Sequence, residues 1–155
     1  MKRRVLAGVV GGGCVEARVA AVAKEVGRRL ARAGAIIVCG GLGGVMEAAS
    51  RGAAEAGGTV IGILPGPSVE DANRWVTHPV ATNMGHARNA IIVQTADFLV
   101  AIGGEAGTLS EIAIALKIGK PVFSIESWDI PGVRNIADPD ALMEALEGFG
   151  LRGQP

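Results

Sequence analysis

The sequence has few of the residues that several common kinds of protein need. Its 155 residues include two cysteines, three phenylalanines, two tryptophans and no tyrosine. Two cysteines are too few for a disulfide framework or a thiolate metal cluster, so we expect Cys14 and Cys39 to be buried, reduced thiols and expect no metal site. A stacking platform for single-stranded nucleic acid has almost no aromatic side chains from which to be built.

The sequence also lacks an excess of charge and long hydrophobic runs. Lysine and arginine number 15, as do aspartate and glutamate. Non-specific binding of nucleic acid depends on excess positive charge, so we expect no nucleic-acid partner. The apolar run at residues 5–10 is shorter than the ~7–15 residues of a signal-peptide core, and glycines end it. No stretch approaches the ~18 apolar residues of a membrane helix, so we expect a cytoplasmic protein with no membrane partner.

What the sequence does contain is 24 glycines and 49% hydrophobic residues, arranged as apolar runs that alternate with helical patterns. The predicted strands are 5–10, 35–39, 59–64, 75–80, 97–102 and 122–125. The predicted helices are 16–33, 45–56, 85–96, 108–118 and 138–147. Strands that are apolar throughout indicate a parallel sheet covered on both faces. We therefore expect one domain over residues 1–155, a Rossmann-like three-layer α/β/α sandwich with a mostly parallel sheet of six or seven strands and a frayed tail from about residue 148.

Charge is unevenly distributed along the chain. Residues 1–34 hold eight Lys/Arg and two Glu, whereas residues 97–147 hold nine acids and three bases. One interpretation is an electrostatic dipole that orients a partner or a second subunit. The other is a set of ordinary solvated helix faces.

The first candidate binding segment follows predicted strand 35–39 and contains Gly40, Gly41, Gly43 and Gly44. Glycines let backbone N–H groups turn toward a bound anion, and the helix that follows adds partial positive charge. The alternative is that a tight strand-to-helix turn simply needs glycine. The spacing matches neither G-x-G-x-x-G nor a P-loop, which argues against hydrolysis of ATP at a Walker site.

The second candidate segment contains Met84, His86, Arg88 and Asn89 at the start of predicted helix 85–96. No other lysine or arginine lies between residues 75 and 116. A lone arginine among apolar residues either binds an anion or forms an internal salt bridge. His86 either contacts a ligand or caps the helix.

The third candidate segment follows predicted strand 97–102 and contains Gly103, Gly104, Glu105, Gly107 and Thr108. A glycine turn that opens a helix is a second cradle for a phosphate. Thr108 and Glu111 also have the spacing of a capping box, in which the glutamate only bonds back to the helix cap. The alternative is that Glu111 reaches the sugar of a bound sugar phosphate.

At these residues the sequence resembles a Rossmann-like family that includes the LONELY GUY cytokinin-activating phosphoribohydrolases, once labelled possible lysine decarboxylases. It is most similar to the short prokaryotic branch, which is related to molybdenum cofactor carrier proteins. The hydrolase motifs P-G-G-x-G-T-x-x-E and M-H-x-R-K align with residues 103–111 and 85–89. The resemblance implies that the glycine turn holds a 5′-phosphate and that Arg88 and Glu111 are catalytic.

This sequence departs from those motifs at three positions. Gly103 replaces proline, Glu105 replaces glycine, and Asn89 replaces the lysine that follows the arginine. An added negative charge and a lost positive charge weaken a phosphate pocket. Further candidate ligand contacts are Met84, His86, Asn89 and Glu105.

Two functions are expected from these features. The first is a nucleotide-binding phosphoribohydrolase, which cleaves the N-glycosidic bond of a nucleoside 5′-monophosphate to base and ribose 5-phosphate and requires no cofactor. The alternative is a non-catalytic carrier or sensor, which binds a molybdenum-cofactor-like pterin or a nucleotide signal. The apolar run at residues 90–93 and the resemblance both predict a homodimer or a higher homo-oligomer.

Overall fold

The computed structural model describes residues 3–151 of the chain. Its strands are β1 (Leu6–Gly11), β2 (Ile36–Cys39), β3 (Val60–Leu64), β4 (His78–Ala81), β5 (Phe98–Ile102), β6 (Val122–Ile125) and β7 (Arg134–Asn135). Its α-helices are α1 (Ala17–Arg32), α2 (Val45–Glu55), α3 (Arg88–Thr95), α4 (Ala106–Lys117) and α5 (Pro139–Ala145). Two short 3-10 helices are η1 (Val69–Asp71) and η2 (Gly85–Ala87).

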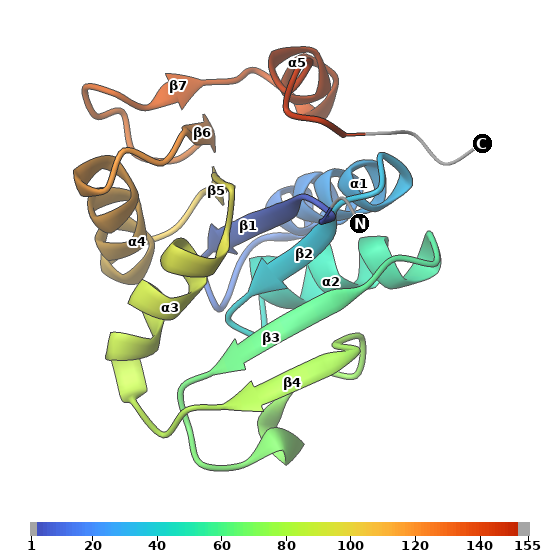
Figure 1. Cartoon of the computed structure of the whole chain (residues 1–155), viewed down its shortest axis with the longest axis vertical. Helices are drawn as coiled ribbons and strands as arrows, with labels where there is room; N and C mark the ends of the chain where they lie inside the picture. The colour runs from blue at the N-terminus through green and yellow to red at the C-terminus, as the bar shows by residue number, and fades with distance from the viewer. Residues whose placement is uncertain (1–2, 152–155) are drawn as a thin grey trace.

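The seven strands form one parallel sheet in the order β4-β3-β2-β1-β5-β6-β7. The chain runs outward from β1 to β4, returns to the other side of β1, and runs outward again through β5 to β7 (Figure 1). The direction of winding therefore changes between β1 and β5. In open α/β sheets a ligand binds at such a switch point, beside the carboxyl ends of the strands.

Two hydrophobic cores lie on opposite faces of this sheet. One is formed with apolar residues of α1, α2 and α5, and the other with apolar residues of α3 and α4. Successive residues of β5 alternate between them, since Val100 belongs to the first core and Leu99 and Ala101 to the second. Strands covered in this way on both faces are apolar throughout, which is why the sequence pattern predicted them. The predicted Rossmann-like α/β/α sandwich is confirmed.

Some predicted boundaries were wrong. The strand predicted at 75–80 lies at His78–Ala81, because Asn73 forms a turn in which its side chain accepts a hydrogen bond from the Trp75 amide at 3.0 Å. The helix predicted from residue 108 begins at Ala106. Strand β7, which is only two residues long, was not predicted. Within residues 3–151, no helix is both long and apolar enough to cross a membrane.

One residue of the predicted frayed tail, Phe149, packs against the sheet. Phe149 packs against Phe98 and Phe123, with ring centroids 5.3 and 5.9 Å apart and the rings edge to face. The chain has three phenylalanines, and all of them meet in this one cluster. Edge-to-face aromatic pairs stabilise a fold beyond the area that they bury, so the partly buried Phe149 attaches the segment after α5 to the core. Residues 152–155 lie outside the described residues.

The uneven charge is partly compensated inside the molecule. Arg3 pairs with Asp97 at 2.6 Å, Arg18 with Glu126 at 2.6 Å, and Arg29 with Asp140. Each pair joins the basic N-terminal part of the chain to its acidic C-terminal part. The pairs are exposed, so each contributes only about 0–1 kcal/mol. These exposed ion pairs favour the interpretation that the charged residues form ordinary solvated faces over the interpretation of an electrostatic dipole.

Most of the apolar run at residues 90–93 packs inside the fold of the single chain. Ile92 and Val93 are buried against the sheet, and Ala90 and Ile91 are half-buried. The run therefore gives no separate support for an oligomer, whose existence stays a prediction.

Helices α1 and α2 approach each other closely because glycines lie where they meet. A Cβ atom at Gly52 would overlap the carbonyl oxygen of Lys24. The substitution Gly52→Ala is expected to lower the melting temperature by several degrees, since overpacking costs about 1–3 kcal/mol. Thermal denaturation measures this, with Gly107→Ala as control because, beyond its chain neighbours and its own helix backbone, no atom lies within 4 Å of its Cβ position. Equal melting temperatures for the two variants would contradict the close packing of α1 and α2.

Candidate functional site

A cleft of about 530 Å³ opens at the carboxyl ends of β1 and β5, where the winding of the sheet changes direction. Three segments line it together with Met46 of α2. They are the loop after β1 (residues 11–15), the turn from η2 into α3 (His86, Arg88 and Asn89), and the start of α4 (Gly104, Glu105, Gly107, Thr108 and Glu111). The structure thus brings together the second and third segments predicted from the sequence.

The glycine turn before α4 presents backbone N–H groups. Gly103 and Gly104 have φ values of 55° and 99°, which favour glycine. The helix begins at Ala106, and its N-cap residue Glu105 makes no capping hydrogen bond with its side chain. The first N–H groups of a helix have no partner within it, so they are available to an anion.

Two side chains from the segment after β6 hold this turn in place. The Ser127 hydroxyl donates to the carbonyl oxygen of Gly103 at 2.5 Å, and the Trp128 indole donates to that of Glu105 at 3.2 Å. In a trans peptide the carbonyl and the following N–H point in opposite directions. The N–H groups of Gly104 and Ala106 therefore point away from these two side chains. Sequence reasoning missed Ser127 and Trp128, because only the pairing of β6 with β5 places them here.

Arg88 begins α3 and is 8% exposed. Its Nη1 donates to the Asn89 side-chain oxygen at 2.5 Å, while its Nε is buried and has no partner among residues 3–151. Burial lowers the pKa of Arg88 below its usual value, and the nearby carboxyl of Glu111 opposes this. The predicted clamp thus lies in the cleft with donors that no described residue occupies.

Glu111 lies one turn beyond Thr108 in α4 and is 6% exposed. The capping-box interpretation is wrong, because Thr108 is inside the helix and the Oε2 atom of Glu111 has no partner among the described residues. Burial raises the pKa of Glu111 to about 8, although the charge of Arg88 lowers it. The carboxyl is therefore mainly protonated at neutral pH. Within the described chain Arg88 and Glu111 form no direct ion pair, although the charge of each shifts the pKa of the other toward its ionised form.

The first glycine segment does not line the cleft. Gly40 and Gly41 are buried, and Gly43 and Gly44 line a neighbouring hollow beside Trp75. A Cβ atom at Gly44 would overlap the carbonyl oxygen of Gly12, so this glycine is needed for close packing of two loops. The geometry favours the alternative that these glycines serve a tight turn.

The loop after β1 takes the place expected for the first glycine segment. Gly12, Gly13 and Cys14 line the cleft directly after the first strand of the sheet. In Rossmann-like folds, glycines directly after the first strand let the backbone approach a phosphate. The glycines after predicted strand 5–10 are such a signal, and it could have identified this loop from the sequence. Cys14 is exposed, so its predicted burial was wrong, whereas Cys39 is buried and the pKa of its thiol is raised by that burial.

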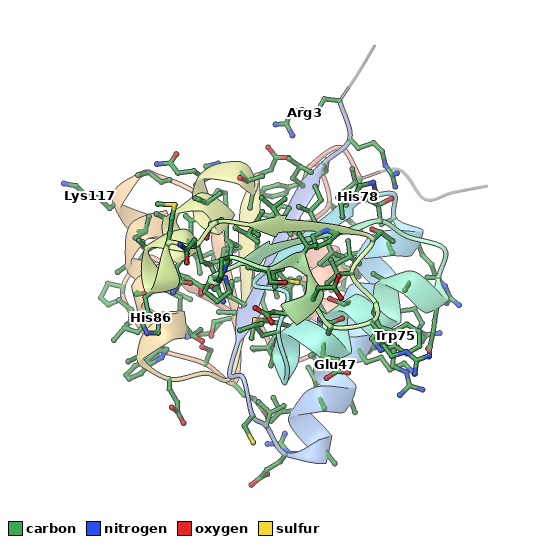
Figure 2. All side chains as sticks on the ribbon, turned by 90° about the horizontal axis from the view of Figure 1, so that it is seen from below. Arg3, Glu47, Trp75, His78, His86 and Lys117 are labelled. Atoms are coloured by element: carbon green, nitrogen blue, oxygen red, sulfur yellow. The ribbon has the colours of Figure 1, made fainter. Side chains whose placement is uncertain are left out.

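The remaining candidate contacts differ in their positions. His86 lines the cleft, and Figure 2 shows it beside α3 and α4, far from Trp75. Met84 is 50% exposed and is not among the lining residues. No group of three or more potential metal-ligating side chains occurs in the part of the chain that the structure describes.

The parallel sheet and the glycine-lined cleft at its switch point define a Rossmann-like α/β protein. The chain belongs to the SLOG cluster4 family, whose model matches residues 4–146. It is 47% identical over 134 residues to an uncharacterized protein of Archaeoglobus fulgidus, covering 86% of this chain and 88% of that one. It is 28% identical over 118 residues to the cytokinin riboside 5′-monophosphate phosphoribohydrolase of Rhodococcoides fascians, covering 74% of this chain and 54% of the relative.

Two solved structures are similar over almost their whole length. The molybdenum cofactor binding protein of Rippkaea orientalis superimposes with a TM-score of 0.91 at 33% identity, covering 96% of this chain and 99% of that one. The molybdenum cofactor carrier protein of Chlamydomonas reinhardtii has a TM-score of 0.87 at 36% identity, covering 94% and 97%. The resemblance noted from the sequence is confirmed.

Proposed function

We propose that the protein binds a phosphorylated pterin of the molybdenum cofactor class in the cleft and acts as its carrier. The observation that supports this most is the pair of buried, unpartnered atoms, Arg88 Nε and Glu111 Oε2, in a glycine-lined cleft. Buried polar groups are nearly always hydrogen-bonded, so atoms without a partner in the protein indicate a position for a ligand or an ordered water. Similarity to two cofactor-binding proteins over nearly whole chains favours this class of ligand.

The residues present fit such a ligand. Its phosphate would bind at the start of α4, where backbone N–H groups are free and Arg88 supplies a positive charge. A pterin ring has nitrogen and oxygen atoms that accept hydrogen bonds, and a protonated Glu111 can donate one. A neutral carboxyl also does not repel the phosphate. In this function the chain binds and orients the pterin and needs no bond to be broken.

A second candidate is hydrolysis of a nucleoside 5′-monophosphate. It is supported by the position of Arg88 and Glu111, the pair implied by the resemblance, in one cleft. In the implied mechanism Glu111 stabilises positive charge that develops on the sugar. That role needs an ionised carboxylate, and a pKa of about 8 leaves little of it at neutral pH. The similarity to two cofactor-binding proteins over nearly whole chains is what favours the carrier over the hydrolase.

One preparation tests both functions. The chain is produced in cells that make molybdenum cofactor, and the purified protein is oxidised with iodine in acid so that any bound pterin is measured by its fluorescence. The same protein is incubated with AMP and other nucleoside monophosphates, and free base is measured by chromatography. We expect pterin to copurify at a sizeable fraction of one per chain and base release to equal that of the protein-free control. Base release without any bound pterin would overturn the carrier function.

A further inference from the structure

A chain of hydrogen bonds connects Arg88 to the first turn of α4. Arg88 Nη1 donates to Asn89 Oδ1 at 2.5 Å, and Asn89 Nδ2 donates to Ser110 Oγ at 3.2 Å. Ser110 Oγ in turn donates to the carbonyl oxygen of Gly107 at 2.6 Å. Gly107 and Arg88 both line the cleft, whereas Ser110 is exposed and lies outside it. We call these three side chains the Arg88–Asn89–Ser110 chain.

Each hydrogen bond fixes the orientation of the next. A guanidinium only donates, so the carboxamide must turn its oxygen toward Arg88 and its NH2 group toward Ser110. The Ser110 hydroxyl donates its hydrogen bond to the carbonyl oxygen of Gly107, so the lone pairs of Ser110 Oγ are left to accept from Asn89. The direction of every hydrogen bond is therefore determined, and the guanidinium is tied to the helix start that would hold a phosphate.

Gly40, which directly follows β2, also restricts the position of the Arg88 guanidinium. A Cβ atom at Gly40 would lie 2.8 Å from both Nη1 and Nη2 of Arg88, so the guanidinium packs against this residue at the end of β2. Nη1 is occupied by Asn89, and Nη2 donates to no residue that the structure describes. The guanidinium is thus held by neutral groups, and none of its positive charge is cancelled by an ion pair within the described chain.

We propose that Asn89 and Ser110 are positioning residues, which orient Arg88 toward an anionic ligand at the start of α4 without neutralising it. This inference rests on the proposed binding function. It also gives a physical role to the asparagine at position 89, where the resembled hydrolase motif has lysine. A lysine side chain has no acceptor for the guanidinium, so this arrangement could not form with it.

The test changes Ser110, because this residue does not touch the cleft. Ser110→Ala removes the link to Asn89, and Ser110→Thr keeps the hydroxyl. Ser68→Ala is the matched control, since Ser68 is another serine that bonds to nearby backbone, at η1. Inorganic phosphate is the probe, and its affinity is measured by NMR titration together with the Nε–Hε signal of Arg88. Melting temperatures show whether each variant is folded.

We expect Ser110→Ala to shift the Arg88 signal in the free protein and to weaken phosphate binding about threefold to tenfold, as loss of one hydrogen bond predicts. Ser110→Thr and Ser68→Ala should keep the wild-type affinity and the wild-type Arg88 signal. Asn89→Leu, which has similar size and no acceptor, should have an effect at least as large as that of Ser110→Ala. An unchanged Arg88 signal and affinity in folded Ser110→Ala would overturn the positioning role.

Failure of the proposed function gives a different result. If wild-type protein binds neither phosphate nor pterin, the binding function fails. The Arg88 signal of free Ser110→Ala protein still decides whether Ser110 orients the guanidinium. A shifted Arg88 signal in a protein that binds no ligand would confirm the hydrogen bonds of the Arg88–Asn89–Ser110 chain. It would contradict the proposed role of that chain in ligand binding.

Discussion

Replacing Glu111 by glutamine is expected to stabilise the protein strongly at pH 8 and hardly at all near pH 4.5. Burial raises the pKa of Glu111 from 4.5 to about 8 in the folded chain. Between these two values the folded state holds a proton that the unfolded state has released, so stability falls as pH rises. Each unit of pKa difference corresponds to about 1.4 kcal/mol. The full difference is roughly 3–5 kcal/mol, or on the order of 10 °C in melting temperature.

The measurement is thermal denaturation of both proteins at pH 4.5, 6 and 8. The melting temperature of Glu111→Gln should exceed that of wild type by an amount that grows from pH 4.5 to pH 8. Glu55→Gln is a control with the opposite sign, because hydrogen bonds and ion pairs from Lys24 and Arg51 lower the pKa of Glu55. A difference between Glu111→Gln and wild type that does not change with pH would show that Glu111 titrates normally.

Replacing Arg88 by methionine is expected to weaken binding of phosphate or of a phosphorylated pterin by between tenfold and about a hundredfold. Hydrogen bonds to charged groups contribute about 1.5–3 kcal/mol, and a factor of ten in affinity is about 1.4 kcal/mol. Among the described residues that line the cleft, Arg88 is the only lysine or arginine. The folded state should not suffer, because methionine places an apolar side chain where a guanidinium without an ion-pair partner is buried.

Binding is measured by calorimetric titration and stability by thermal denaturation. Arg32→Met is the matched control, because Arg32 is an exposed residue in the last turn of α1, away from the cleft. It removes the same charge from the protein, and we expect it to bind like wild type. If Arg88→Met and Arg32→Met bound phosphate equally well, Arg88 would not be the anion-binding residue.

Much of this architecture could be predicted from local patterns. The strands at Leu6–Gly11 and Val122–Ile125 are short apolar runs bounded by glycine, proline or charge, and their covered faces explain that composition. Arg88 and Glu111 were candidates because each is a polar residue near the start of a predicted helix that follows a strand, and the family resemblance implied that they act together. A glycine turn that opens a helix was also predicted before α4, with the helix start placed two residues too late.

Apart from boundaries set by local turns, the features that sequence patterns missed depended on which segments meet in space. The two glycine loops at residues 11–13 and 40–44 look equivalent in the sequence, yet only the first lies beside β5, at the switch point. Ser127 and Trp128 act on a turn that is more than twenty residues away. Phe149 is at the end of the chain but packs in the core.

The sequence by itself determined the α/β alternation and the parallel sheet and made Arg88 and Glu111 candidates for the site, because these features leave local patterns along the chain. Only the tertiary structure decided the state of those residues. Packing of α3 against α4 and the strand ends has three effects on them. It buries Glu111 and so raises its pKa, it leaves Arg88 and Glu111 without an ion pair in the described chain, and it places Asn89 between Arg88 and Ser110. Solvent exclusion and hydrogen-bond direction depend on distances between elements, and distances between elements follow from the fold as a whole.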